Sequence, residues 1–203
     1  TPNHTIENGI TSVENTELLI FGNHNLQNLN ASRLVCNELG VSNSNFYQKI
    51  ATFKGASNRL ELVKRTEDFA IYKDFAHSPS KLKATSSAMK KQFTNRRLVA
   101  CMELHTFSSL NGGFLKQYKG CMDDPDTAIV YFSPEAIAHK KLETITKKQV
   151  HNAFNRKDLL VFTDSKELEI YLNSLNWEQQ NLLMMSSGTF DGMDFRNLIN
   201  NYN

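Results

Sequence analysis

Two asparagines at the start of a predicted helix are the first residues whose types and spacing could do chemistry. Asn25 and Asn28 lie three positions apart, so they face the same side of the first helical turns. A carboxamide offers a donor and an acceptor together, which is the pair needed to recognise an adenine edge. The alternative is a plain N-cap beside a solvent-facing asparagine, and the spacing alone does not separate the two.

A charged residue lies at each end of a predicted β-hairpin. Arg59 opens its first strand, directly after a loop over 54–58, and a guanidinium can clamp a phosphate with its planar fork of donors. Asp74 follows the second strand, where a carboxylate can accept from ribose hydroxyls. The alternatives are a surface arginine, and an aspartate turn before a helix that begins at Pro79.

Two further polar segments follow predicted strands. The segment 103–108 contains His105, and the segment 185–192 follows the last strand. Small hydroxyl residues and glycine expose backbone N–H groups at a helix start, which suits a carboxylate or phosphate. His77 and His105 have no second histidine or carboxylate at metal-ligand spacing. The sequence therefore predicts no metal site, and a polar histidine with an ordinary hydrogen bond is the default interpretation of both.

These residues need a sheet whose strand ends lie along one edge. The run 18–21 predicts a strand that turns through Gly22 into a helix over 23–39. Period-two runs at 59–63 and 69–72 predict the hairpin, and apolar runs without alternation predict parallel strands at 98–102, 128–132, 159–162 and 182–185. Further helices are predicted through Phe46, Ile50 and Phe53 and over 79–93, 114–122, 147–154, 165–175 and 194–202. The order favours an α/β, Rossmann-like, mainly parallel sheet, with a domain boundary near Phe53.

Composition narrows the class of protein. The 203 residues carry a formal net charge of +2, without a concentrated basic stripe or an apolar run near the ~20 residues of a membrane helix. Three widely spaced cysteines without a CxxC pair favour a reduced, cytoplasmic setting. The start at Thr1 lacks the features of a signal peptide and is typical of a chain entered partway through. We expect neither nucleic acid nor membrane as a partner.

Taken in chain order, the polar segments form five motifs. They are Gly-x-His-Asn-x-x-Asn-x-x-Ala at 22–31, Gly-x-x-x-Arg-x-Glu at 55–61, Tyr-x-Asp-x-Ala-His-x-Pro at 72–79, His-Thr-Phe-Ser at 105–108 and Ser-x-Gly-x-Phe-Asp-Gly at 186–192. Five ordered motifs are a more specific signal than any one of them. The set resembles the Mur ligases, the ATP-dependent amino acid and peptide ligases of bacterial cell-wall synthesis.

The resemblance implies a role for each motif. The implied ATP-binding residues are Asn25 and Asn28 near adenine, Arg59 near the phosphates and Asp74 near the ribose, with His24 and His77 beside them. The implied substrate-binding residues, which hold the incoming amino acid or peptide, are His105, Thr106, Ser186, Ser187, Gly188 and Thr189.

The phosphate-binding loop Gly-x-x-x-x-Gly-Lys-Ser/Thr, which carries a Mg²⁺-binding hydroxyl, does not occur in the sequence. In the Mur ligases this loop belongs to a central domain that lies upstream. The resemblance therefore implies that 1–53 is the end of the central domain and that 54–203 is the C-terminal domain. It also implies ATP and Mg²⁺ as cofactors of a longer enzyme, with most Mg²⁺ ligands outside this chain. We expect the chain alone to be inactive.

The implied reaction is amide formation through an acyl phosphate, with the C-terminal domain closing over the nucleotide. The last motif is most similar to that of family members that join UDP-N-acetylmuramate to L-alanyl-γ-D-glutamyl-meso-diaminopimelate, whereas the His-Thr-Phe element is similar to that of members that use L-alanine. Ligases of the folylpolyglutamate or cyanophycin type share this domain and are an alternative. A non-catalytic α/β binding module is an alternative from another class.

Overall fold

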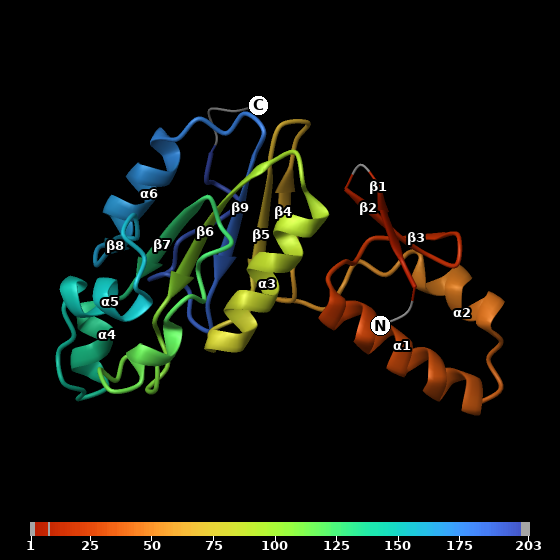
Figure 1. Cartoon of the computed structure of the whole chain (residues 1–203), viewed down its shortest axis with the longest axis horizontal. Coiled ribbons are helices and arrows are strands. Elements are labelled where there is room, and N and C mark those ends of the chain that lie inside the picture. The colour runs from red at the N-terminus through yellow and green to blue at the C-terminus, as the bar shows by residue number, and fades with distance from the viewer. Residues whose placement is uncertain (1–2, 8, 200–203) are drawn as a thin grey trace.

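The computed structural model describes residues 3–7 and 9–199, which form two units that lie side by side (Figure 1). The first unit combines a three-stranded antiparallel sheet with two helices. Its elements are β1 (Thr5–Glu7), β2 (Ile10–Val13), β3 (Thr16–Leu18), α1 (Asn23–Glu38) and α2 (Asn43–Ile50). A small hydrophobic cluster that includes Leu26, Leu29 and Phe46 packs the helices against this sheet.

The predicted strand over 18–21 was wrong in its bounds. β3 ends at Leu18 and is an outer strand of the small antiparallel sheet. Glu14 and Asn15 have φ values of 47° and 62°, which is the conformation of a tight hairpin turn, so Thr16–Leu18 fold back and pair with β2. The turn at Gly22 and the helix after it are confirmed. The first unit is thus a small mixed unit, in which the sequence did not predict the strands β1 and β2.

The second unit is a six-stranded sheet in the order β4-β5-β9-β6-β7-β8. Its strands are β4 (Glu61–Arg65), β5 (Ala70–Asp74), β6 (Arg97–Glu103), β7 (Thr127–Tyr131), β8 (Leu160–Phe162) and β9 (Gln180–Met185). β4 pairs with β5 antiparallel, and the other neighbours pair in parallel. The predicted mainly parallel sheet with an outer hairpin is therefore confirmed, and the carboxyl ends of β5, β9, β6 and β7 share one edge.

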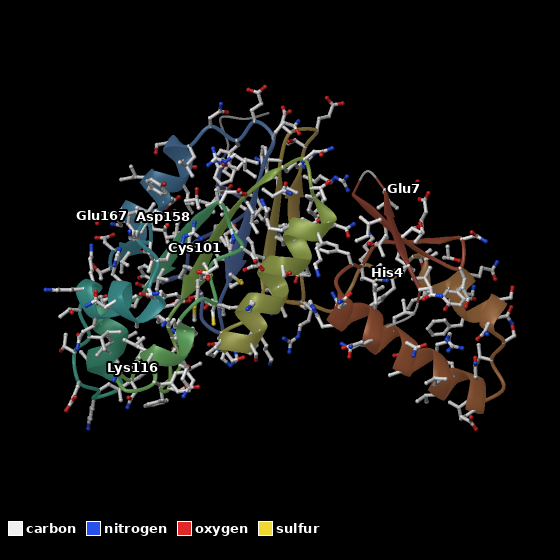
Figure 2. All side chains as sticks on the ribbon, viewed as in Figure 1. His4, Glu7, Cys101, Lys116, Asp158 and Glu167 are labelled. Atoms are coloured by element: carbon white, nitrogen blue, oxygen red, sulfur yellow. The ribbon has the colours of Figure 1, made fainter. Side chains whose placement is uncertain are left out.

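Helices cover both faces of this sheet (Figure 1). They are α3 (Pro79–Gln92), α4 (Pro134–His139), α5 (Lys147–Phe154) and α6 (Ser165–Ser174), with a short 3₁₀ helix at Leu115–Tyr118. α3, α4 and α5 contribute to one hydrophobic cluster, and α6 contributes to the other. Successive strand residues alternate between the two clusters, as Ala100 and Cys101 do, because strand side chains point to opposite faces. Figure 2 shows Cys101 inside the sheet, and its thiol is free.

Two predicted helices differ from the structure. The helix over 114–122 is reduced to the 3₁₀ turn at Leu115–Tyr118, since Lys119 leaves the helical conformation with a ψ of 122° and Gly120 follows with a φ of 72°. Residues 194–199 form turns, because the Asp194 carboxylate accepts from the backbone N–H of Arg196 and from the Asn197 amide, both at 2.9 Å. The rest of that prediction, 200–202, lies outside the described residues. The short helix α4 was missed.

The two units meet through polar and aromatic contacts near the end of α3. The Gln92 side chain accepts from the Thr11 hydroxyl at 2.8 Å and donates to the carbonyl of Gly9 at 2.6 Å. The ring of Phe21 lies edge-on to Tyr72, with centroids 5.4 Å apart. These contacts fix how the first unit sits beside α3. Within 3–7 and 9–199, none of the helices has the length and hydropathy that crossing a bilayer requires.

Candidate functional site

A cavity of about 870 Å³ lies between the two units, and we call it the inter-unit cavity. The structure brings five of the predicted nucleotide-binding residues to its lining. They are His24, Asn25 and Asn28 from α1, Arg59 from the segment before β4 and Asp74 from the end of β5. His77 is not part of this lining; its Nδ1 lies 2.9 Å from the carbonyl oxygen of Phe75.

Asp74 is a buried carboxylate at the wall of the inter-unit cavity. It is 5% exposed. Its Oδ2 accepts from the backbone N–H of Leu60 at 2.8 Å, and its Oδ1 accepts from that of Ala76 at 2.7 Å. Burial raises the pKa of Asp74, although these two N–H groups and the charges of His24 and Arg59 act in the opposite direction. Asp74 thus holds two loops at the cavity as well as facing it.

His24 faces the same cavity in a half-buried position near the start of α1. Burial lowers its pKa, the charge of Asp74 opposes this shift, and the charge of Arg59 adds to it. The neutral imidazole is therefore favoured. A neutral ring can donate from one nitrogen and accept at the other, which suits a polar ligand.

Arg59 is an exposed cation at the cavity mouth. Its guanidinium lies 5.6 Å from the centroid of the Phe75 ring, a cation–π contact that orients it. In the part of the chain that the structure describes, no carboxylate forms an ion pair with it. Lys81, in the first turn of α3, lines the same cavity and adds a positive charge that the motifs did not single out. Together these cations favour an anionic ligand.

The two asparagines of α1 differ in their surroundings. The amide nitrogen of Asn25 donates to the carbonyl of Phe21 at 2.9 Å, so part of its role is to fix the entry into the helix. Asn28 is exposed and lines the cavity. Asn25 can therefore both fix the start of the helix and face a ligand, whereas Asn28 can only face a ligand.

A second group of residues lies at the carboxyl edge of the sheet around the buried side chain of Glu103, which is 2% exposed. Its Oε2 accepts from the Ser186 hydroxyl and from the backbone N–H of Phe190, the latter at 3.0 Å. Its Oε1 lies 3.4 Å from Nδ1 of His105. We call Glu103, His105, Ser186 and Gly188 the Glu103 cluster. One carboxylate thus connects the two segments that were predicted to hold substrate.

Gly188 makes the closest approach within the Glu103 cluster. A Cβ atom there would lie 2.7 Å from Glu103 Oε2 and 2.7 Å from His105 Cγ, which is closer than carbon atoms tolerate. Its backbone N–H donates to the Ser186 hydroxyl at 2.6 Å. Only glycine fits this position. Glu103 itself was missed as a site residue, although a carboxylate at the end of a buried strand is a usable signal.

The other predicted substrate residues have different surroundings. Thr106 Oγ1 accepts from the backbone N–H of Ser109 at 3.1 Å and so stabilises its own turn. Ser187 Oγ is buried and has no hydrogen-bond partner among residues 3–7 and 9–199.

Tyr131 donates to the carboxylate of Asp191, which ties the far end of the 186–192 loop to β7. Burial and this carboxylate raise the pKa of Tyr131.

No group of three or more histidine, cysteine, aspartate or glutamate side chains with metal-binding geometry occurs within the described ranges 3–7 and 9–199.

The sheet order, the antiparallel outer strand and the first unit define an α/β protein with the fold of the Mur ligases. The structure of UDP-N-acetylmuramate–alanine ligase from Thermotoga maritima matches with a TM-score of 0.73 and 17% identity, over 94% of this chain and 42% of that chain. A murein peptide ligase from Psychrobacter arcticus matches with a TM-score of 0.60 and 21% identity, over 94% and 42% of the two chains. Likenesses at this identity establish the fold.

Sequence comparison also finds similar curated proteins. The UDP-N-acetylmuramate–L-alanine ligase of Sulfurihydrogenibium sp. (strain YO3AOP1) is 37% identical over 113 residues, which cover 56% of this chain and 24% of the relative. That of Cutibacterium acnes is 38% identical over 93 residues, which cover 45% and 20%. The chain is thus similar in sequence to these ligases and has the fold of the Mur ligases. The chain spans about a quarter of the length of these relatives, and no family model matches it.

Proposed function

We propose that this chain is part of an ATP-dependent, amide-forming ligase of bacterial peptidoglycan metabolism that acts in the cytoplasm. The observation that carries the proposal is the gathering of His24, Asn25, Asn28, Arg59 and Asp74 around one cavity. A MurF ligase of the same fold was solved with ADP, at a TM-score of 0.64 and 14% identity over 93% of this chain and 42% of that chain. The inter-unit cavity is accordingly the proposed ATP site.

The chemistry of the lining supports this assignment. Asn28 presents a carboxamide that can pair with an adenine edge, and Arg59 with Lys81 supplies positive charge for phosphates. Each carboxylate oxygen of Asp74 accepts one backbone N–H. A carboxylate oxygen can accept more than one hydrogen bond, so Asp74 can also accept from a ribose hydroxyl.

The proposed division places 1–53 in a central ATP-binding domain and 54–203 in the C-terminal domain. The separate hydrophobic cluster of the first unit supports it. In the proposed reaction the γ-phosphate of ATP passes to a muramoyl carboxylate with release of ADP, and an amine then attacks the acyl phosphate to form the amide with release of phosphate. Arg59 stabilises the charge of the phosphates, and the Glu103 cluster holds the amine substrate beside them. Mg²⁺ accompanies ATP, with its ligands mostly outside this chain.

Two amine substrates are proposed for different reasons. The Ser-x-Gly-x-Phe-Asp-Gly motif at 186–192 favours the tripeptide L-alanyl-γ-D-glutamyl-meso-diaminopimelate. The curated relatives, which are L-alanine ligases, favour L-alanine. A folylpolyglutamate-type ligase and a binding module without activity are the remaining alternatives.

One assay separates these alternatives. A longer form of the protein that includes its upstream sequence is incubated with ATP, Mg²⁺ and UDP-N-acetylmuramate, and phosphate release is followed with each amine. Release that depends on the tripeptide or on L-alanine supports the proposal and identifies the substrate. Release with neither amine contradicts it, and release only with a folate and glutamate supports the folylpolyglutamate type.

A further inference from the structure

The imidazole of His105 lies between a buried carboxylate and solvent. Its Nδ1 is 3.4 Å from Oε1 of Glu103, and the two side chains are 36% and 2% exposed. The ring also packs against the backbone of Gly188, where a Cβ atom would lie 2.7 Å from Nδ1. Among residues 3–7 and 9–199, no group forms a hydrogen bond with its Nε2. One edge of the ring is thus held, and the other can meet a ligand.

The carboxylate of Glu103 decides which ring nitrogen carries the proton. Its Oε2 accepts from the Ser186 hydroxyl and the Phe190 N–H, which leaves Oε1 to face His105. A carboxylate only accepts hydrogen bonds, so a neutral imidazole beside it carries its proton on Nδ1. Nε2 then keeps its lone pair and can accept a proton.

The same carboxylate stabilises the cation that forms when Nε2 takes a proton. A buried negative charge at this distance from the ring attracts the imidazolium and holds its orientation, as the carboxylate of a catalytic triad does. Cys101, two residues earlier on β6, stays a neutral thiol, because burial and the charge of Glu103 raise its pKa well above the ordinary value. The strand therefore brings one carboxylate to His105 and no competing base.

Other ionisable groups near this edge come from β7, the 186–192 loop and α4. Tyr131 donates to the carboxylate of Asp191, and burial and this carboxylate raise the pKa of Tyr131. The ammonium of Lys140 lies 5.4 Å from the centroid of the Phe107 ring. The phenol and the ammonium carry their protons at neutral pH, and a carboxylate is a weaker base than an imidazole. Among these groups, His105 is the one suited to accept a proton near pH 7.

The edge of the sheet places His105 near the proposed ATP site. The backbone carbonyl of Asp74, at the wall of the inter-unit cavity, accepts from the N–H of Ser186 at 3.0 Å. Ser186 in turn donates to Glu103, which faces His105. Because β5, β9 and β6 are neighbours, the ends of β5 and β6 lie roughly 10 Å apart. An amine beside His105 can therefore reach an acyl phosphate formed at the cavity.

We infer that Nε2 of His105 accepts a proton from the ammonium of the amine substrate, and that Glu103 positions the imidazole for this step. The inference rests on the proposed function and deepens it. Loss of the proton gives the nitrogen the lone pair with which it attacks the carbonyl carbon of the acyl phosphate. The tetrahedral intermediate then breaks its bond to the phosphate oxygen, and the leaving phosphate takes a second proton from the nitrogen. The proton on Nε2 passes to solvent.

The kcat of a longer form of the protein, measured with ATP, Mg²⁺, UDP-N-acetylmuramate and the preferred amine, tests the inference. His105→Ala is expected to lower kcat at pH 7 by about a hundredfold or more, the usual contribution of a general base. Added imidazole should restore part of this rate in proportion to its neutral form, since it can occupy the place of the lost ring. The control is His151→Gln on α5, where the ring lies 3.3 Å from the carbonyl oxygen of Lys157. It should keep the original rate and not respond to imidazole.

Glu103→Gln tests the positioning role. The amide NH₂ of a glutamine can donate to Nδ1, which moves the ring proton to Nε2 and removes the acceptor from the substrate side. The kcat should fall by at least about tenfold while the KM for ATP stays the same, because the fault is the wrong tautomer. Imidazole should not restore this rate, since the ring of His105 still fills its place.

Circular dichroism verifies that each variant is folded, and His105→Gln, which keeps a side chain of similar reach, should show the same loss of kcat as His105→Ala. An unchanged kcat in either His105 variant overturns the inference alone, as does a folded His105→Ala whose lost rate does not respond to imidazole. An unchanged kcat of Glu103→Gln overturns the positioning role. Absence of turnover by the unchanged protein with every amine overturns the proposed function, and the inference with it.

Discussion

The carboxylate of Glu103 accepts a hydrogen bond from the hydroxyl of Ser186, and the two residues lie at the ends of the neighbouring strands β6 and β9. The same carboxylate also faces His105. A change at Glu103 therefore acts on both segments that are proposed to hold the amine substrate. Three predictions test the structure, and a fourth tests the proposed function.

Glu103→Gln should destabilise the chain. A glutamine oxygen can take the place of Oε2 toward the Ser186 hydroxyl and the Phe190 N–H, but its amide NH₂ then replaces Oε1 toward His105, and the negative charge of all three contacts is lost. Loss of charged hydrogen bonds in a buried site costs about 1–3 kcal/mol of unfolding free energy. Urea unfolding measures it, and the exposed Glu178→Gln is the matched control. Equal midpoints for the two variants contradict the described role of Glu103.

Gly188→Ala should also destabilise the chain, for a steric reason. The added Cβ would lie 2.7 Å from Glu103 Oε2, so the loop or the carboxylate must shift, at a cost of about 1–3 kcal/mol. Gly112→Ala is the control, because nothing lies within 4 Å of a Cβ at that position. Thermal unfolding of both variants decides the point. A Gly188→Ala melting temperature at or above that of Gly112→Ala is incompatible with the close approach.

His24→Gln should remove a pH dependence of stability. The pKa of His24 is lowered in the folded chain, so the unfolded chain binds the proton more readily. Neutral His24 therefore contributes its full stabilisation to the folded chain above the ordinary histidine pKa. This stabilisation is lost as the pH falls through the lowered pKa of the folded chain. Urea unfolding between pH 7.5 and pH 5 should therefore show a shallower decline for His24→Gln than for the unchanged chain. The exposed His139→Gln is the control, and the account fails if both variants decline alike.

The sequence predicted the main sheet because its signals are local and repeated. Apolar runs without alternation marked the buried parallel strands, and the start of α3 at Pro79 agreed with its prediction. The run 18–21 misled, because the pairing is decided by a hairpin turn with positive φ at Glu14 and Asn15, and only Asn15 is of a residue type that favours such a turn. A turn replaces the predicted helix at Asp194, because the Asp194 carboxylate accepts two hydrogen bonds. The spacing of apolar residues does not show such bonds.

The sequence predicted some residues of the candidate site and did not predict others. The motifs pointed to Asn28, Arg59 and Asp74, which come from distant parts of the chain and line one cavity. Their roles toward a nucleotide stay predictions. Glu103 lay in a predicted polar segment, but its central position in the site was not foreseen, because that position depends on which loop lies against it. The order of residues in the sequence does not show which loop makes that contact.

The activity of Arg59→Ala tests the central proposal most directly. Phosphate release is measured in a longer form of the protein with ATP, UDP-N-acetylmuramate and the preferred amine, for the unchanged protein, Arg59→Ala and Arg97→Gln as the matched control. Removing a cation that stabilises transferring phosphate is expected to lower kcat by at least about a hundredfold, while Arg97→Gln retains the original rate. An Arg59→Ala rate equal to that of the unchanged protein would contradict the placement of ATP in the inter-unit cavity.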